Sequence, residues 1–184
     1  MYQVNPQDND KTLANELLTA ETKLIMDNWL NKYPIDQRRS ALIGSLHAAQ
    51  DQNGGWLSKD IMKAVGQYLE IPAIWVYEAA SFYSMFFTKP CGKHKLAICT
   101  NISCMLNGAE DIVAHTEEKL GIKLGETTPD GRITLVKEEE CVAACVGAPV
   151  LLVDGHYHEN LTPDKIDKLI EGLSSKSKDK EDAQ

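Results

Sequence analysis

Four of the five cysteines fall into two short groups, and these thiols are the side chains in the sequence best suited to chemistry. The first group is Cys99 and Cys104 in CTNISC, and the second is Cys141 and Cys145 in CVAAC. A fold that brings the two groups together offers four soft thiolates. Such a set suits an iron–sulfur cluster, a zinc ion or two disulfides.

The spacing within each group separates these three alternatives. Structural zinc usually takes its thiolates from tight knuckles, so the spacing permits zinc without favouring it. A two-iron cluster is wider than one ion, needs two ligands for each iron, and occurs with a C-x4-C step in plant-type ferredoxins. Disulfides are rare in a reducing cytosol, and residues 1–10 have neither the basic start nor the apolar stretch of an export signal. The sequence therefore favours a 2Fe–2S cluster, then zinc, then disulfides.

The residues around the cysteines carry a family resemblance. The first group lies in CTNISCMLNGAEDI and the second in ECVAACVGAPV, while upstream the chain reads RRSALIGSLHAAQDQNGGWL and VYEAASFYSMFFTKPCGKH. From about Leu24 to about Leu173, the sequence resembles the thioredoxin-like 2Fe–2S subunit (the E-type subunit) of NADH:quinone oxidoreductase, respiratory complex I. The same module occurs in NAD-linked formate dehydrogenases and NAD-reducing hydrogenases, so these parent enzymes are the alternatives.

The resemblance implies an electron-transfer subunit that carries one 2Fe–2S cluster. Its ligands would be the four grouped cysteines, Cys99, Cys104, Cys141 and Cys145. The partner would be a larger subunit that holds FMN, accepts hydride from NADH and carries a 4Fe–4S cluster. The expected location is the bacterial cytoplasm, at the inner membrane through the rest of the complex.

Ahead of the cysteines, the sequence predicts an extended or partly ordered N-terminal arm over residues 1–21 and a helical bundle over 22–90. Apolar residues recur at helical spacing in four segments, and proline, glycine and Ser58 mark their ends. The expected helices cover residues 22–31, 35–52, 58–69 and 72–83.

The pattern after Pro90 predicts a thioredoxin-like 2Fe–2S domain over residues 91–173. Strands are expected at 94–100, 133–137, 149–153 and 156–158, and Asp154-Gly155 between the last two is a strong hairpin signal. Helices are expected at 104–120 and 162–173. The order β-α-β-β-β-α makes the whole chain α+β. Residues 174–184 are charged, lack large apolar side chains and are expected to form a disordered tail.

Composition excludes several classes of function. A net charge of −8 and a pI near 5.1 argue against nucleic-acid binding, which needs clustered Lys and Arg. The longest apolar run, residues 71–87, contains Glu78 and is too short to span a bilayer, so no direct membrane insertion is expected. No Gly-rich phosphate loop is present, so NADH and FMN should bind to a partner.

Two different classes compete with electron transfer. A thioredoxin-like thiol oxidoreductase would normally present C-x-x-C, which this sequence lacks. A zinc-stabilised interaction module has no redox role. Cys91 lies outside both groups and is expected to be a bystander. Some of the bundle's aromatic residues should anchor a partner, and others should form the core of the bundle. These residues are Trp56, Trp75, Tyr77, Tyr83, Phe86 and Phe87.

Overall fold

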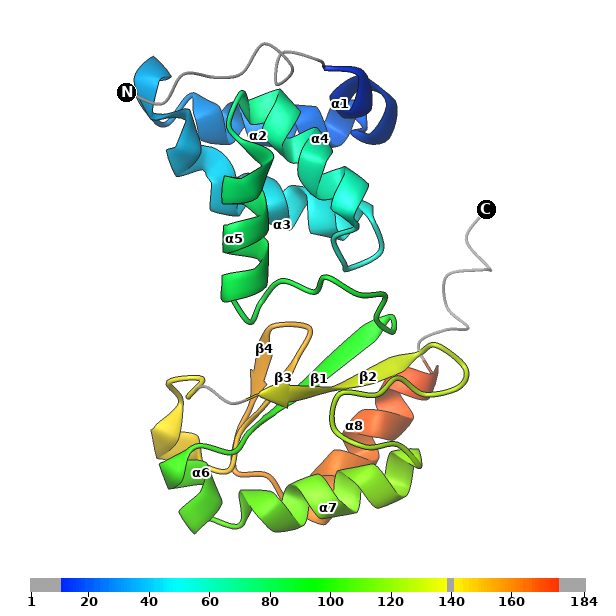
Figure 1. The fold of residues 1–184 in the computed structure, drawn as a ribbon. Helices are drawn as coiled ribbons and strands as arrows, with labels where there is room; N and C mark the ends of the chain where they lie inside the picture. Colours follow the sequence, from blue (N-terminus) through cyan, green and yellow to red (C-terminus); the bar gives the residue numbers. More distant parts are fainter. Residues whose placement is uncertain (1–10, 139–140, 176–184) are drawn as a thin grey trace. The chain divides into compact units, whose positions relative to one another are not determined.

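The computed structural model describes residues 11–138 and 141–175. The chain forms two compact units, Met1–Pro90 and Cys91–Gln184. Figure 1 shows helices alone in the described part of unit 1, and helices with a sheet in unit 2. No helix in the described ranges has the length and apolar character needed to cross a membrane.

Unit 1 is a bundle of short helices around an apolar core. The helices are α1 (Thr12–Leu17), α2 (Ala20–Leu30), the 3-10 helix η2 (Ile35–Ala41), α3 (Leu42–Gln52), α4 (Lys59–Leu69) and α5 (Ala73–Phe82). Side chains cap two of them: the Ser58 cap of α4 was predicted, and the Thr19 cap of α2 was not. The Ser58 hydroxyl accepts a hydrogen bond from the Ile61 amide at 3.1 Å, and the Thr19 hydroxyl accepts one from the Thr22 amide at 3.2 Å.

Two expectations for unit 1 were wrong. Residues 12–17 form α1 rather than an extended arm; Ala14 is buried, and its amide donates to the Gln67 side chain at 3.1 Å. Packing of this kind supports a helix too short to be stable alone. The helix expected over 35–52 begins as η2 because Gln37 leaves helical geometry, with φ −112° and ψ 34°.

Unit 2 has one mixed sheet with helices. Its strands are β1 (His94–Cys99), β2 (Ile133–Glu138), β3 (Leu151–Val153) and β4 (His156–His158), in the order β2-β1-β3-β4. β1 is parallel to β2 and antiparallel to β3, which is antiparallel to β4. The helices are α6 (Ile102–Leu106), α7 (Ala109–Leu120), the 3-10 helix η3 (Cys145–Gly147) and α8 (Pro163–Ser175).

The core of unit 2 lies where α7 and α8 cover one face of the sheet (Figure 1). Leu96, Leu135 and Leu151 from three neighbouring strands are fully buried there, together with Ile166 of α8. The α+β fold class, with a helical unit followed by a domain built on a mixed sheet, is confirmed.

Two details of unit 2 differ from expectation. The helix expected over 104–120 is broken, because α6 ends at Leu106 and α7 begins after Gly108, whose φ of +86° does not fit a continuous right-handed helix. Of the expected disordered tail, residues 174–175 belong to α8, and 176–184 lie outside the described residues.

Candidate metal centre

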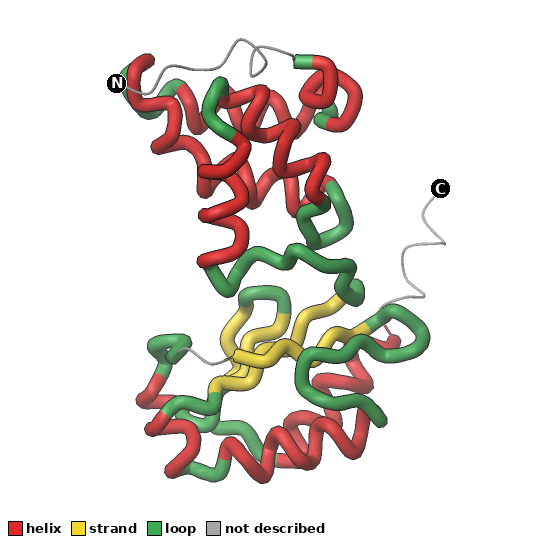
Figure 2. The backbone as a smooth tube through the Cα atoms, viewed as in Figure 1, coloured by secondary structure: helices red, strands yellow, loops and turns green. Residues whose placement is uncertain are grey.

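The parallel pairing of β1 and β2 brings the two cysteine groups to one edge of the sheet. Parallel strands end at the same edge, and Cys99 is the last residue of β1, paired in register with Glu138 at the end of β2. Cys141 follows β2 by three positions. Figure 2 shows the strands of unit 2, in yellow, side by side in one sheet. In open α/β sheets, ligands typically bind beyond the carboxyl ends of the strands.

The first cysteine group is buried and held by backbone hydrogen bonds. The side chains of Cys99 and Cys104 are 1% and 2% exposed. The Cys99 amide donates to the Val150 carbonyl at 3.0 Å, which ties the end of β1 to the residue before β3. Asn101 caps α6, since its side-chain oxygen accepts from the Ile102 amide at 3.0 Å. Cys104 therefore lies inside the first turn of α6 and does not open the helix as expected.

The second group is exposed and lies on a tight loop. The sulfurs of Cys141 and Cys145 are 3.5 Å apart, and both residues are exposed. Ala143 lies between them with φ +61°, the left-handed region that non-glycine residues rarely occupy, and its amide donates to the Cys141 sulfur at 3.4 Å. The Ser103 hydroxyl of α6 donates to the Cys145 carbonyl at 3.5 Å, and so links the two groups.

The four thiols, which we call the cysteine row, affect one another's protonation. The Cys141 and Cys145 sulfurs are in contact, and the Cys99 side chain contributes to the pKa shifts of both Cys104 and Cys141. Burial, followed by the Cys99 side chain, raises the pKa of Cys104 to about 11. The Ala143 amide and then Cys145 lower the pKa of Cys141, whereas the hydrogen bond to Cys141 raises the pKa of Cys145. Cys141 is therefore the member of the exposed pair that releases its proton more readily.

The donor chemistry of this row fits a two-iron cluster. Two thiolates on one tetrahedral metal, each about 2.3 Å from it, stand about 3.8 Å apart, which is close to the Cys141–Cys145 separation of 3.5 Å. A cluster with two irons needs two ligands at each iron and not four around one point. The assignment of all four cysteines as ligands stays a prediction.

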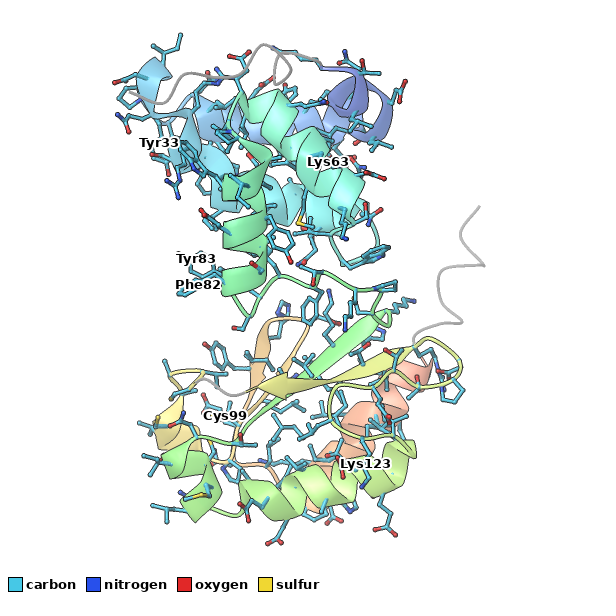
Figure 3. The ribbon with its side chains drawn as sticks, viewed as in Figure 1. Tyr33, Lys63, Phe82, Tyr83, Cys99 and Lys123 are labelled. Carbon is cyan, nitrogen blue, oxygen red and sulfur yellow. The ribbon has the colours of Figure 1, made fainter. Side chains whose placement is uncertain are left out.

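Cys91, the fifth cysteine, is half-buried in unit 2, and burial raises the pKa of its thiol. Figure 3 labels Cys99, at the end of β1 where the cysteine groups meet.

Sequence reasoning missed two residues at this edge. Ser103 could have been found because it lies inside the first cysteine group. Tyr157 could not, since only the folded hairpin brings its hydroxyl to the Val142 carbonyl, 2.9 Å away.

The aromatic residues of unit 1 divide between core and surface. Phe86 is buried and packs against His47, with ring centroids 4.9 Å apart. Trp56, Trp75 and Phe87 are half-buried. Tyr77 and Tyr83 are exposed, and so is Phe82, a residue that sequence reasoning did not single out and that is 78% exposed. Figure 3 shows the side chains of Phe82 and Tyr83 projecting from the end of α5.

Comparison with known proteins agrees with this geometry. The sequence profile described as "Thioredoxin-like [2Fe-2S] ferredoxin" matches residues 26–174. The E-type subunit of the NADH-quinone oxidoreductase of Rickettsia felis is 45% identical over 82% of this chain and 90% of the relative. Its counterpart in Rickettsia bellii is 43% identical over 81% and 89%, and an E-type subunit of the same enzyme in Rhizobium meliloti is 44% identical over 77% and 82%.

The solved structures show the same fold at lower identity. A chain of an NAD+-reducing [NiFe]-hydrogenase in the air-oxidised state aligns with a TM-score of 0.60 and 24% identity, over 71% of this chain and 23% of the hydrogenase chain. The hydrogen-reduced state of that enzyme gives the same TM-score. Because the family profile matches most of the sequence and the E-type relatives align along most of their own length, the chain belongs to the thioredoxin-like 2Fe–2S ferredoxin family.

Proposed function

We propose that this chain is the 2Fe–2S electron-transfer subunit of an NADH-quinone oxidoreductase. One observation carries the proposal: relatives named as the E-type subunit of that enzyme are 43–45% identical over about four fifths of this chain. The family profile and the row of four thiols support it, since both point to a cluster rather than to a hydrolytic or nucleotide-binding site.

The cysteines at the sheet edge would hold the cluster, which when bound supplies one-electron transfer. Cys99 and Cys104 lie in the protein interior, so their side of the site excludes water. Cys141 and Cys145 lie at the surface, which leaves the path to a redox partner short on that side. The Ala143 amide donates to the Cys141 sulfur and so stabilises the negative charge of its thiolate.

The proposal requires a partner that binds FMN, takes hydride from NADH and carries a 4Fe–4S cluster. Unit 1 offers a surface for such a subunit. Five large apolar side chains on and just after α5 are more than 40% exposed, and they are Ile74, Tyr77, Phe82, Tyr83 and Met85. Apolar and aromatic side chains gathered in this way are typical of the buried centre of an interface. The assembled complex would place the chain on the cytoplasmic side of a bacterial inner membrane.

A test follows from the division of labour. NADH delivers a hydride, whereas a 2Fe–2S centre moves single electrons, so a flavin must convert one into the other. The cluster-loaded chain alone should therefore show no NADH-dependent reduction of ferricyanide. The same chain copurified with its flavin-bearing partner should show it. Steady NADH oxidation by the flavin-free chain would contradict the proposal.

Two other functions are separated by simple observations. The Cys141 and Cys145 sulfurs are close enough to take part in dithiol–disulfide exchange, which makes a thiol oxidoreductase the second candidate. That function needs free thiols and predicts a colourless, iron-free protein that reduces a disulfide substrate. A different parent enzyme, an NAD-reducing hydrogenase or formate dehydrogenase, predicts hydrogenase or formate dehydrogenase subunits in the purified complex.

A further inference from the structure

The loop that carries Cys141 and Cys145 is tied to a segment later in the chain, residues 157–161. The Tyr157 hydroxyl of β4 donates to the Val142 carbonyl at 2.9 Å. The Asn160 amide donates to the Gly147 carbonyl at 2.6 Å, and the Leu161 amide donates to the Pro149 carbonyl at 3.1 Å. These three hydrogen bonds fix the loop at its start, at its end and just beyond it.

The segment that holds the loop is itself held by α8. The Lys165 ammonium group donates to the carbonyls of Glu159 and Asn160, at 3.2 and 2.9 Å. Both acceptors precede α8, and Asn160 has a φ of +50°, so these contacts fix an unusual turn. Lys165 therefore stabilises the residue whose amide reaches Gly147.

The loop needs outside support because its own backbone is strained. Ala143 lies in the left-handed region with φ +61°, where an alanine side chain crowds the backbone. Such a conformation persists only where neighbouring structure imposes it. The Val142 carbonyl belongs to the peptide bond that joins Val142 to Ala143, so the hydrogen bond from Tyr157 acts on the strained position itself.

We infer that Tyr157 is a positioning residue that, with the 159–160 turn and Lys165, clamps the 141–147 loop in the geometry the site needs. The inference rests on the proposed function in so far as the clamped loop serves a cluster. The Tyr157 hydroxyl holds the loop by donating a hydrogen bond to the Val142 carbonyl. That carbonyl shares its peptide group with the Ala143 amide, so the same hydrogen bond orients the amide that donates to the Cys141 sulfur. Loss of the hydroxyl should loosen the loop without unfolding unit 2.

The test compares Tyr157→Phe and Lys165→Met with two matched controls in the full chain. Tyr33→Phe removes the hydroxyl of an exposed tyrosine in unit 1, and Lys168→Met removes another exposed lysine of α8. Two readouts are taken: amide hydrogen exchange of residues 142–147 in the cluster-free chain, and the electron paramagnetic resonance spectrum and reduction potential of the reduced, cluster-loaded chain.

We expect the loop amides of Tyr157→Phe to exchange about 2- to 10-fold faster than those of wild type, the effect of losing one typical hydrogen bond. Lys165→Met loses two hydrogen bonds and should speed the exchange at least about 2-fold. The loaded variants should show altered spectra or potentials, and the controls should match wild type. Wild-type loop exchange and an unchanged spectrum in Tyr157→Phe would overturn the inference, as would equally faster exchange throughout unit 2. If wild type binds no cluster, the proposed function fails. The hydrogen-exchange measurement on the cluster-free chain still tests whether Tyr157 and Lys165 hold the loop.

Discussion

Gly147, two residues after Cys145, is a position where the structure leaves no space for a side chain. A β-carbon added there would lie 2.4 Å from the Oε2 atom of Glu159 and 2.6 Å from its β-carbon, where ordinary contact begins at 3.4 Å. The carboxylate can swing away, but the β-carbon cannot move without its backbone. That backbone is tied to Gly147 by the 2.6 Å hydrogen bond from the Asn160 amide to the Gly147 carbonyl.

Gly147→Ala should therefore destabilise unit 2. Overpacking a tight contact costs about 1–3 kcal/mol, and weakening the Asn160–Gly147 hydrogen bond adds about 1 kcal/mol. The expected loss is about 2–4 kcal/mol of unfolding free energy. Each kcal/mol lowers the melting temperature of a domain of this size by about 4–8 °C. All three tryptophans lie in unit 1, so the loss in unit 2 is measured by far-ultraviolet circular dichroism.

The controls separate the Glu159 contact from a general effect of alanine. Gly172→Ala in α8, where an added β-carbon meets nothing within 4 Å, should be neutral or stabilising by up to about 1 kcal/mol. In a double-mutant cycle with Glu159→Gly, the double variant should be more stable than the two single losses predict, by about 1–3 kcal/mol. A Gly147→Ala protein as stable as wild type, or a cycle without coupling, would refute this reasoning.

Three further predictions concern the ligands, a tyrosine and the partner surface. Replacing any one cysteine of the two groups by serine should abolish or badly deplete the cluster, whereas Cys91→Ser should keep it. Iron and sulfide analysis checks this, and a full cluster in one of the four variants would show that its cysteine is not a ligand. Burial, then the hydrogen bond from Tyr68 to Asp27 at 2.7 Å, raises the pKa of Tyr68 to about 12. A raised pKa contributes stability that is complete below about pH 10 and lost as the pH rises to about 12. The unfolding free energy measured with urea should therefore fall more steeply across this range in wild type than in Tyr68→Phe. Equal pH dependence in the two proteins would contradict it. Phe82→Asp should leave folding within about 0.5 kcal/mol of wild type, as at other exposed sites, yet reduce copurification with the flavin-bearing partner at least about tenfold; undiminished copurification would remove Phe82 from the interface.

Local rules explain which parts of the fold were predictable. The Ser58 cap and the Asp154-Gly155 hairpin depend on residues close in sequence, and both were found. The start of α1 depends on α4, which lies far along the chain, and the break at Gly108 depends on one residue that a helical pattern tolerates on paper. The start of α1 therefore needs a tertiary contact that no local pattern contains, whereas the break at Gly108 is a local feature that the helical spacing of the apolar residues concealed.

The same distinction holds at the candidate site. The four cysteines could be chosen from their spacing and neighbours, and their common edge follows once β1 and β2 are known to be parallel. The contrast between a buried pair and an exposed pair could not be predicted, because it depends on how Ala109 and Val150 pack with Cys99 and Cys104. Tyr157 was missed for a similar reason, since it reaches the loop from β4 through a single hydroxyl.

The central claim is that the four grouped cysteines hold a two-iron cluster, and anaerobic purification of the full chain followed by metal and sulfide analysis tests it most directly. The account predicts a red-brown protein with two irons and two acid-labile sulfides per chain, and a paramagnetic signal that appears on one-electron reduction. A colourless chain with one zinc and no sulfide, or with four free thiols after reconstitution with iron and sulfide, would contradict it.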